Sequence, residues 1–205
     1  MANRSMRMLG RVVGPLALLA CLFVGSAQAL VVSYDATLDG LAEIPPNASP
    51  STGDALVTVD LDTLMMDVQI TFAGLVGTTT ASHIHCCTSV PGSANVGVAT
   101  ILPTFTGFPL GVTSGTYDHT FDMSLASSYN PAFVTAQGSI STAFTALIAG
   151  METGNAYLNI HTSEFPGGEI RGLLQPVAPP DVPEPATLAL VGIGLAGIGF
   201  LRRKH

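Results

Sequence analysis

Positive charge is nearly absent from the middle of this sequence. The chain has 205 residues and 7 Lys and Arg. They lie at its two ends, apart from Arg171: Arg4, Arg7, Arg11, Arg202, Arg203 and Lys204. Between Leu30 and Pro180, twelve Asp and Glu residues stand against Arg171 alone. Because such a segment repels phosphate backbones and anionic headgroups, we expect no nucleic acid partner. Divalent cations, a basic partner surface or simple solubility outside the cell agree better with this charge.

Cysteine and the motifs of common enzyme families are also scarce. Cys21 lies in an N-terminal apolar segment, so only the adjacent pair Cys86 and Cys87 remains for the rest of the chain. No nucleophile elbow, P-loop, dinucleotide fingerprint or H-E-x-x-H motif is present. Several aspartates are scattered without the spacing of an acid/base pair and are expected on the solvated surface: Asp35, Asp39, Asp54, Asp60, Asp62 and Asp67. We therefore expect no enzymatic activity.

The N-terminal residues 1–29 have the three parts of a Sec signal peptide. A basic start is followed by an apolar stretch from Val12 to Val24 and then by Ala27-Gln28-Ala29, which matches the A-x-A cleavage pattern. Cleavage is expected after Ala29. A lipoprotein signal ending at Cys21 is the alternative, but Leu18 and Leu19 match that pattern less well.

The C-terminal end is set apart by proline and then by a lack of charge. Residues 176–185 are rich in proline and favour an extended linker. Residues 186–205 contain an uncharged stretch from Ala186 to Leu201, followed at once by a basic end. At 1.5 Å per residue such a helix covers about 24 Å, so flanking residues must help it cross the membrane. We expect a single transmembrane helix with its basic end in the cytoplasm, and one domain over residues 30–175.

The tail resembles a known sorting signal. Pro183, Glu184 and Pro185, the apolar helix and the basic end follow one another in the order of the PEP-CTERM signal. The resemblance implies recognition by an exosortase-type membrane protease, removal of the tail and only transient residence in the inner membrane. It also implies delivery to the surface, envelope or exopolysaccharide matrix of a Gram-negative bacterium.

Apolar residues alternate with polar ones through much of residues 30–175. Examples are Ala55, Val57 and Val59, and then Met66, Val68, Ile70 and Phe72. Turn residues punctuate the chain at short intervals, so we predict an all-β fold, an antiparallel sandwich or barrel. One short helix is expected from Ser139 to Met151, and residues 155–161 and 169–174 should form a hairpin across residues 164–168.

Three segments of this domain resemble the CHRD family, first described in chordin. They are LDGLAEIPP at residues 38–46, ASHIH at 81–85 and AYLNIHTSEFPGGEIRGLL at 156–174. The resemblance implies an extracellular β domain without an established enzymatic activity. The chain departs from the family pattern at Cys86-Cys87, where glycine is usual.

Histidines in two of these segments suggest a site. Strand alternation places His83 and His85 on one face, with Asn159 and His161 together on another strand, and with isoleucine opposite each pair. Three imidazoles, with Cys87 as a fourth ligand, suit copper or zinc. Alternatively the histidines brace the hairpin by hydrogen bonds, with Arg171 paired to Glu164 or Glu169. We favour the second interpretation and expect no cofactor. His119 is expected to be isolated.

The adjacent cysteines allow three arrangements in an oxidising compartment. Cys86 and Cys87 form a vicinal disulfide, Cys87 serves as a metal ligand, or a thiol cross-links to another chain. The vicinal disulfide is favoured because exposed free thiols are poorly tolerated outside the cell. The sequence as a whole indicates a non-enzymatic envelope or matrix protein whose domain binds exopolysaccharide or other envelope components. The alternative is a copper- or zinc-dependent redox or metal-storage domain.

Overall fold

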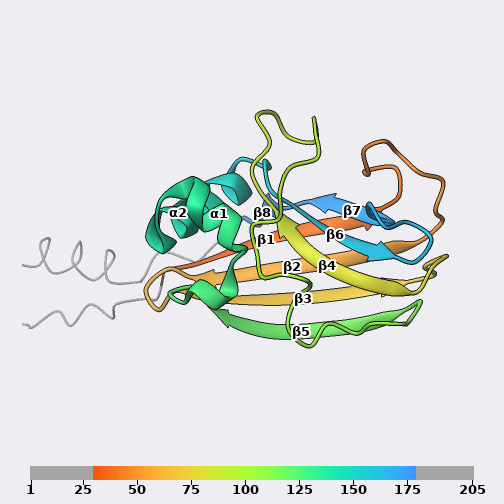
Figure 1. Cartoon of the computed structure of the whole chain (residues 1–205), viewed down its shortest axis with the longest axis horizontal. Coiled ribbons are helices and arrows are strands. Elements are labelled where there is room, and N and C mark those ends of the chain that lie inside the picture. The colour runs from red at the N-terminus through yellow and green to blue at the C-terminus, as the bar shows by residue number, and fades with distance from the viewer. Residues whose placement is uncertain (1–29, 179–205) are drawn as a thin grey trace, which may run out of the picture.

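The computed structural model describes residues 30–178, and they form a curled antiparallel sheet with helices at one end (Figure 1). The sheet order is β4-β6-β7-β1-β2-β3-β5, with β8 paired to β1. The strands are β1 (Val31–Asp39), β2 (Thr52–Asp60), β3 (Met65–Ala73), β4 (Thr79–His85), β5 (Gly115–Asp122), β6 (Tyr157–Thr162), β7 (Ile170–Leu173) and β8 (Gln175–Pro176). The expected all-β antiparallel class is therefore confirmed.

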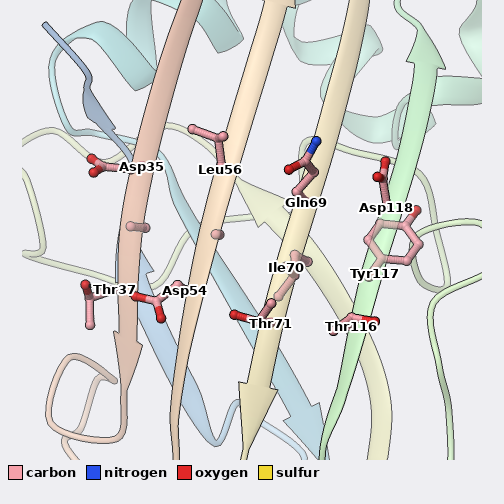
Figure 2. Close-up of a pocket in the computed structure, with 12 residues that line it drawn as sticks. Asp35, Thr37, Asp54, Leu56, Gln69, Ile70, Thr71, Thr116, Tyr117 and Asp118 are labelled. Carbon is pink, nitrogen blue, oxygen red and sulfur yellow. Dashed lines mark hydrogen bonds between the residues drawn. The ribbon is translucent and has the colours of Figure 1, made fainter.

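The alternation of the sequence becomes the two faces of the sheet. One face is buried and apolar, because every second residue of β1, β2 and β3 points into a single core, as Tyr34, Val57 and Val68 do. The other face of β1, β2, β3 and β5 is polar and holds a shallow hollow of about 560 Å³ (Figure 2). Asp35 and Asp54 stand there in solvent, as expected.

The long segment between β4 and β5 completes the curl of the sheet. Phe105 donates its backbone N–H to the Ser82 carbonyl, and Gly111 donates to the Thr79 carbonyl. The side chain of Phe105 is fully buried beside Tyr117 of β5, with their ring centroids 5.8 Å apart. This segment therefore joins the two outer strands of the sheet and covers part of its rim.

The helical region is larger than the sequence indicated. The expected helix is α2 (Ile140–Glu152), and its capping box joins Ser139 and Thr142. The structure adds α1 (Pro131–Gln137) and the 3-10 helix η1 (Ala126–Ser128). Local chemistry explains α1, since Asn130 caps its start and Gly138 ends it in the left-handed conformation with φ of 93°. With seven residues, α1 is too short to show a full helical period in the sequence.

The predicted hairpin is confirmed, because β6 pairs antiparallel with β7 across residues 163–169. The expected signal peptide, its cleavage after Ala29, and the tail with Pro183, Glu184 and Pro185 lie outside the described residues. Within residues 30–178, no single helix is long and apolar enough to span a membrane. The α1 and α2 helices pass that test only as a pair, and the pair is bent by 94°.

Candidate metal centre

Strands β4 and β6 bring three histidines together at one end of the sheet. In their antiparallel register, His83 lies opposite Asn159 and Ala81 lies opposite His161. The three rings cluster, with centroids 5.3 Å apart for His83 and His161, and 5.9 Å for His83 and His85. Their isoleucine neighbours Ile84 and Ile160 are fully buried in the core. The predicted division into a histidine face and an isoleucine face is confirmed.

Loops of the molecule cover the histidine face. His83 and His85 are buried and His161 is half-buried. The covering segment is the β4–β5 connection, which supplies the carbonyls of Val96 and Pro103 to the rings. The centre is therefore shielded from bulk water.

Each imidazole is oriented by a backbone carbonyl. His83 donates from Nε2 to Pro103 O at 2.6 Å, His85 from Nδ1 to Val96 O at 2.7 Å, and His161 from Nδ1 to Pro166 O at 2.8 Å. A carbonyl oxygen only accepts, so the nitrogen facing it must carry the proton. The other nitrogen of each ring then holds a free lone pair, and carbonyl contacts of this kind commonly orient histidine ligands.

The three free nitrogens converge. His83 Nδ1, His85 Nε2 and His161 Nε2 are buried and have no hydrogen-bond partner in the described part of the chain. One ring nitrogen from each of the three histidines lies within 4.8 Å of the other two. Burial lowers the pKa of His83 and of His161, and it lowers the pKa of His85 to about 4. The rings are thus neutral at pH 7, as metal ligation requires. The donor set fits copper or zinc.

A stacked column supports His85 from the side. The ring of Tyr157 lies parallel to that of His85, with a centroid distance of 4.7 Å and an interplanar angle of 5°. The guanidinium carbon of Arg171 lies 3.4 Å from the Tyr157 centroid. Arg171 also donates to Asn95 Oδ1 at 2.8 Å and to Ala94 O at 3.1 Å. The sequence did not indicate this column, because Ala94 and Asn95 belong to a loop without a periodic pattern.

The expected ion pair of Arg171 with Glu164 or Glu169 is wrong. Glu169 instead accepts backbone N–H groups of Val76 and Gly77 at 2.6 and 3.2 Å. It also accepts three hydroxyl groups, at 2.7 to 2.8 Å, from Ser49, Ser51 and Thr162. Glu164 is exposed. The reason is that Glu169 lies before β7, where the chain turns its carboxylate toward the end of β3 rather than toward Arg171.

Two buried polar residues beside the histidines were missed from the sequence as site residues. Glu43 and Asn159 are 5% and 2% exposed, and Glu43 Oε1 and Asn159 Oδ1 lack a partner. Together with the three imidazole nitrogens they make up all the buried side-chain atoms without a partner within residues 30–178. Burial raises the pKa of Glu43 to about 7, although the charge of Arg171 and the Asn159 amide oppose the shift. In the sequence, Glu43 lies within the CHRD-like segment at residues 38–46, and no pattern marks it as a site residue.

The cysteines and the remaining histidine lie outside the cluster. Cys86 and Cys87 are joined by a disulfide, the arrangement favoured from the sequence. Cys87 therefore has no free thiol for a metal, and the group of converging ligand atoms contains only the three histidines. His119 lies on β5 between Tyr117 and Phe121, away from the cluster.

Comparison with known protein families shows which family the chain belongs to. The model of the CHRD domain matches residues 34–174. The chain belongs to the CHRD family. The three clustered histidines lie inside the matched CHRD domain, and so do Asn159 and Glu43. No curated protein and no solved structure matched the chain.

A second family model, the PEP-CTERM protein-sorting motif, matches residues 181–204, on the C-terminal side of the CHRD domain. The motif implies processing by an exosortase, a membrane protein. It also indicates export to the cell envelope or surface of a Gram-negative bacterium. The CHRD domain of this chain is therefore an exported, exosortase-sorted domain.

Proposed function

We propose that this CHRD domain is a non-catalytic metal-binding module of the cell envelope or exopolysaccharide matrix, and that His83, His85 and His161 hold a copper or zinc ion. The observation that carries the proposal is the convergence of three imidazoles, with one ring nitrogen of each within 4.8 Å of the others and one buried nitrogen of each without a partner. Imidazole nitrogens bind these ions at about 2.0–2.1 Å, and three protein ligands leave one position for a further ligand.

The alternative is that the histidines only brace the hairpin, and it explains only half of their contacts. The nitrogens that face Pro103, Val96 and Pro166 do brace the loops. A buried nitrogen left without a partner costs about 1–3 kcal/mol of folding free energy, and here three such nitrogens point to one place. A bound cation removes that cost for all three at once. We therefore favour ligation over bracing alone, which reverses the preference drawn from the sequence.

The setting of the domain agrees with this role. Acidic residues dominate the charge of the domain, and the single Lys or Arg between Leu30 and Pro180, Arg171, is buried. Such a charge distribution attracts divalent cations to the domain. Binding of exopolysaccharide or of other envelope material remains part of the proposal, and the exposed polar face of β1, β2, β3 and β5 is the surface for it (Figure 2).

Metal analysis of the purified full-length protein tests the proposal. After loading with Cu²⁺ or Zn²⁺ and extensive dialysis, we expect about one ion per chain in the wild type and in His119→Gln, and none in His83→Gln. At a hundredfold excess over the dissociation constant, one bound ion adds about 2.7 kcal/mol to the free energy of unfolding. A chelator should therefore lower the melting temperature of the wild type and leave His83→Gln unchanged. Equal metal content in all three proteins would refute the site.

A further inference from the structure

Two further buried oxygens without a partner belong to Asn159 and Glu43. Asn159 is the cross-strand neighbour of His83 and lies two residues before His161 on the same face of β6. Its Oδ1 is buried, and no donor among residues 30–178 reaches it. The same holds for Glu43 Oε1. An amide oxygen and an ionised carboxylate oxygen each accept hydrogen bonds, so one bound group that donates to both would satisfy them.

Glu43 lies next to Asn159 at Gly168. A Cβ atom added to Gly168 would collide with Glu43 Oε1 and would come within 2.8 Å of Asn159 Nδ2. Glycine at this position, with φ of 131°, therefore allows the carboxylate and the amide to approach each other. The Glu43 carboxylate is not itself a member of the converging ligand group, which consists of the three histidines.

The loop that carries Glu43 is held by hydrogen bonds to distant segments of the domain. Asn47 donates from Nδ2 to the Glu169 carbonyl at 3.0 Å, and Asn95 donates from Nδ2 to the Ile44 carbonyl at 2.7 Å. Asn95 is in turn held by Arg171. Two hydrogen bonds therefore hold the loop that carries Glu43 against the rest of the domain.

We propose that a hydroxylic ligand, with water as the first case, occupies the fourth position of the metal and donates its hydrogen bonds to Asn159 Oδ1 and Glu43 Oε1. This inference rests on the metal centre proposed above. A divalent ion bound by three neutral imidazoles keeps its charge and makes the O–H groups of a bound water stronger donors. The carboxylate of Glu43 balances part of that charge. The site is thereby selective for ligands that carry an O–H group over anions that cannot donate.

Glu43 also lies at a hollow of a size suited to such a ligand. It lines a hollow of about 330 Å³ together with Pro45, Pro46 and Phe165, and with the polar side chains of Asn95 and Glu164. Apolar walls with a few convergent polar groups are typical of sites for small molecules.

Pulsed EPR of the Cu²⁺-loaded full-length protein, exchanged into D₂O, tests the inference. We expect imidazole nitrogen couplings together with strongly coupled exchangeable protons from the bound water. A spectrum with imidazole couplings but without exchangeable protons would overturn the inference and leave the metal centre standing. Failure to bind Cu²⁺ at all would overturn the metal centre and this inference together.

Azide, an anion without a donor group, probes the role of Glu43. At pH 8 we expect azide to bind the Cu²⁺ site at least fivefold more tightly in Glu43→Gln, because the variant loses a negative charge and gains an amide donor. Glu164→Gln removes a charge from the same hollow without touching a buried oxygen, so its azide affinity should equal that of the wild type. An unchanged affinity in Glu43→Gln, or an equal change in both variants, would overturn the assignment of Glu43.

Discussion

At the scale of single residues, burial decides the protonation of the candidate site. Burial shifts the pKa values of the histidines and of Glu43 in opposite directions. It lowers the pKa of each of the three histidines and raises that of Glu43. In both cases burial disfavours the charged form. The result at neutral pH is a set of neutral imidazoles beside a carboxyl group that titrates near pH 7.

The raised pKa of Glu43 predicts how the stability of the metal-free protein depends on pH. Its folded pKa of about 7 exceeds the value of 4.5 for a free side chain, so the folded state holds a proton that the unfolded state releases between these values. This contribution to stability is complete below pH 4.5 and is lost as the pH rises through 7. Gln resembles the protonated form at every pH. The change that Glu43→Gln makes in the free energy of unfolding should therefore be more favourable at pH 8 than at pH 5, by roughly 1–3 kcal/mol.

Urea unfolding of both metal-free proteins at pH 5 and pH 8 measures this difference. Glu164→Gln is the control, because Glu164 is exposed, and it should have the same small effect at both pH values. A Glu43→Gln variant that is equally destabilised at both pH values would show that the carboxyl group titrates normally.

At the scale of elements, Glu169 connects the end of β3 to the hairpin of β6 and β7. Burial raises its pKa, but hydrogen bonds from the Val76 N–H and from the hydroxyls of Thr162, Ser49 and Ser51 outweigh that effect, so the pKa is lowered overall. The carboxylate is therefore ionised in the folded protein. Glu169→Gln replaces one acceptor oxygen by a donor that faces other donors, and we expect a loss of about 3 kcal/mol in the free energy of unfolding.

Chemical denaturation at pH 7 checks this value, with Glu164→Gln again as the control. The stabilising contribution of Glu169 is present above its unfolded pKa and is lost as the pH falls below about 4.5. The difference between wild type and Glu169→Gln should therefore shrink in acid. A constant difference from pH 7 to pH 3 would contradict the ionised state.

Helix α2 packs closely against the cysteine pair at Gly150. A Cβ atom added at Gly150 would collide with Cys86 Sγ and come within 2.7 Å of Cys87 Sγ. Ala in place of Gly normally stabilises a helix interior by about 1 kcal/mol. Here we expect Gly150→Ala to lower the melting temperature instead. In a background of Cys86→Ala with Cys87→Ala, the same change should be neutral or stabilising.

Thermal unfolding of the four proteins measures this coupling as a double-mutant cycle. Mass spectrometry of the peptide that carries Cys86 and Cys87 should also show two hydrogens fewer than the dithiol. If Gly150→Ala had the same effect in both backgrounds, the helix would not be fitted to the cysteines.

The sequence predicted those features that repeat along a strand. Period-two alternation placed Ile84 and Ile160 in the core and His83, His85 and His161 opposite them, and the structure confirms this division. Glu43, Asn95 and the true partners of Arg171 could not be predicted in this way. They meet through loops, whose paths depend on the tertiary fold and leave no periodic pattern. Convergence of the histidines in turn required the register of β4 and β6.

At the scale of the whole molecule, sorting should depend on the motif after the domain. We expect Pro183→Ala combined with Glu184→Ala to leave full-length protein in the membrane fraction, because the exosortase no longer recognises it. Pro179→Ala with Pro180→Ala changes the proline content before the motif and serves as the control. Immunoblots of membrane and surface fractions check this prediction. Equal processing of both variants and of the wild type would contradict it.

The pairing of β8 with β1 determines where the histidine cluster lies relative to the C-terminal end of the domain. Tyr34 lies opposite Pro176, so the two ends of the described chain leave the sheet side by side (Figure 1). Asp39, at the far end of β1, lies opposite Arg171, which in turn pairs with Asn159 beside the histidines. Five residues separate Tyr34 from Asp39, which is about 17 Å of strand. A domain tethered through its C-terminus therefore carries the histidine cluster on the part of the sheet that lies away from the tether.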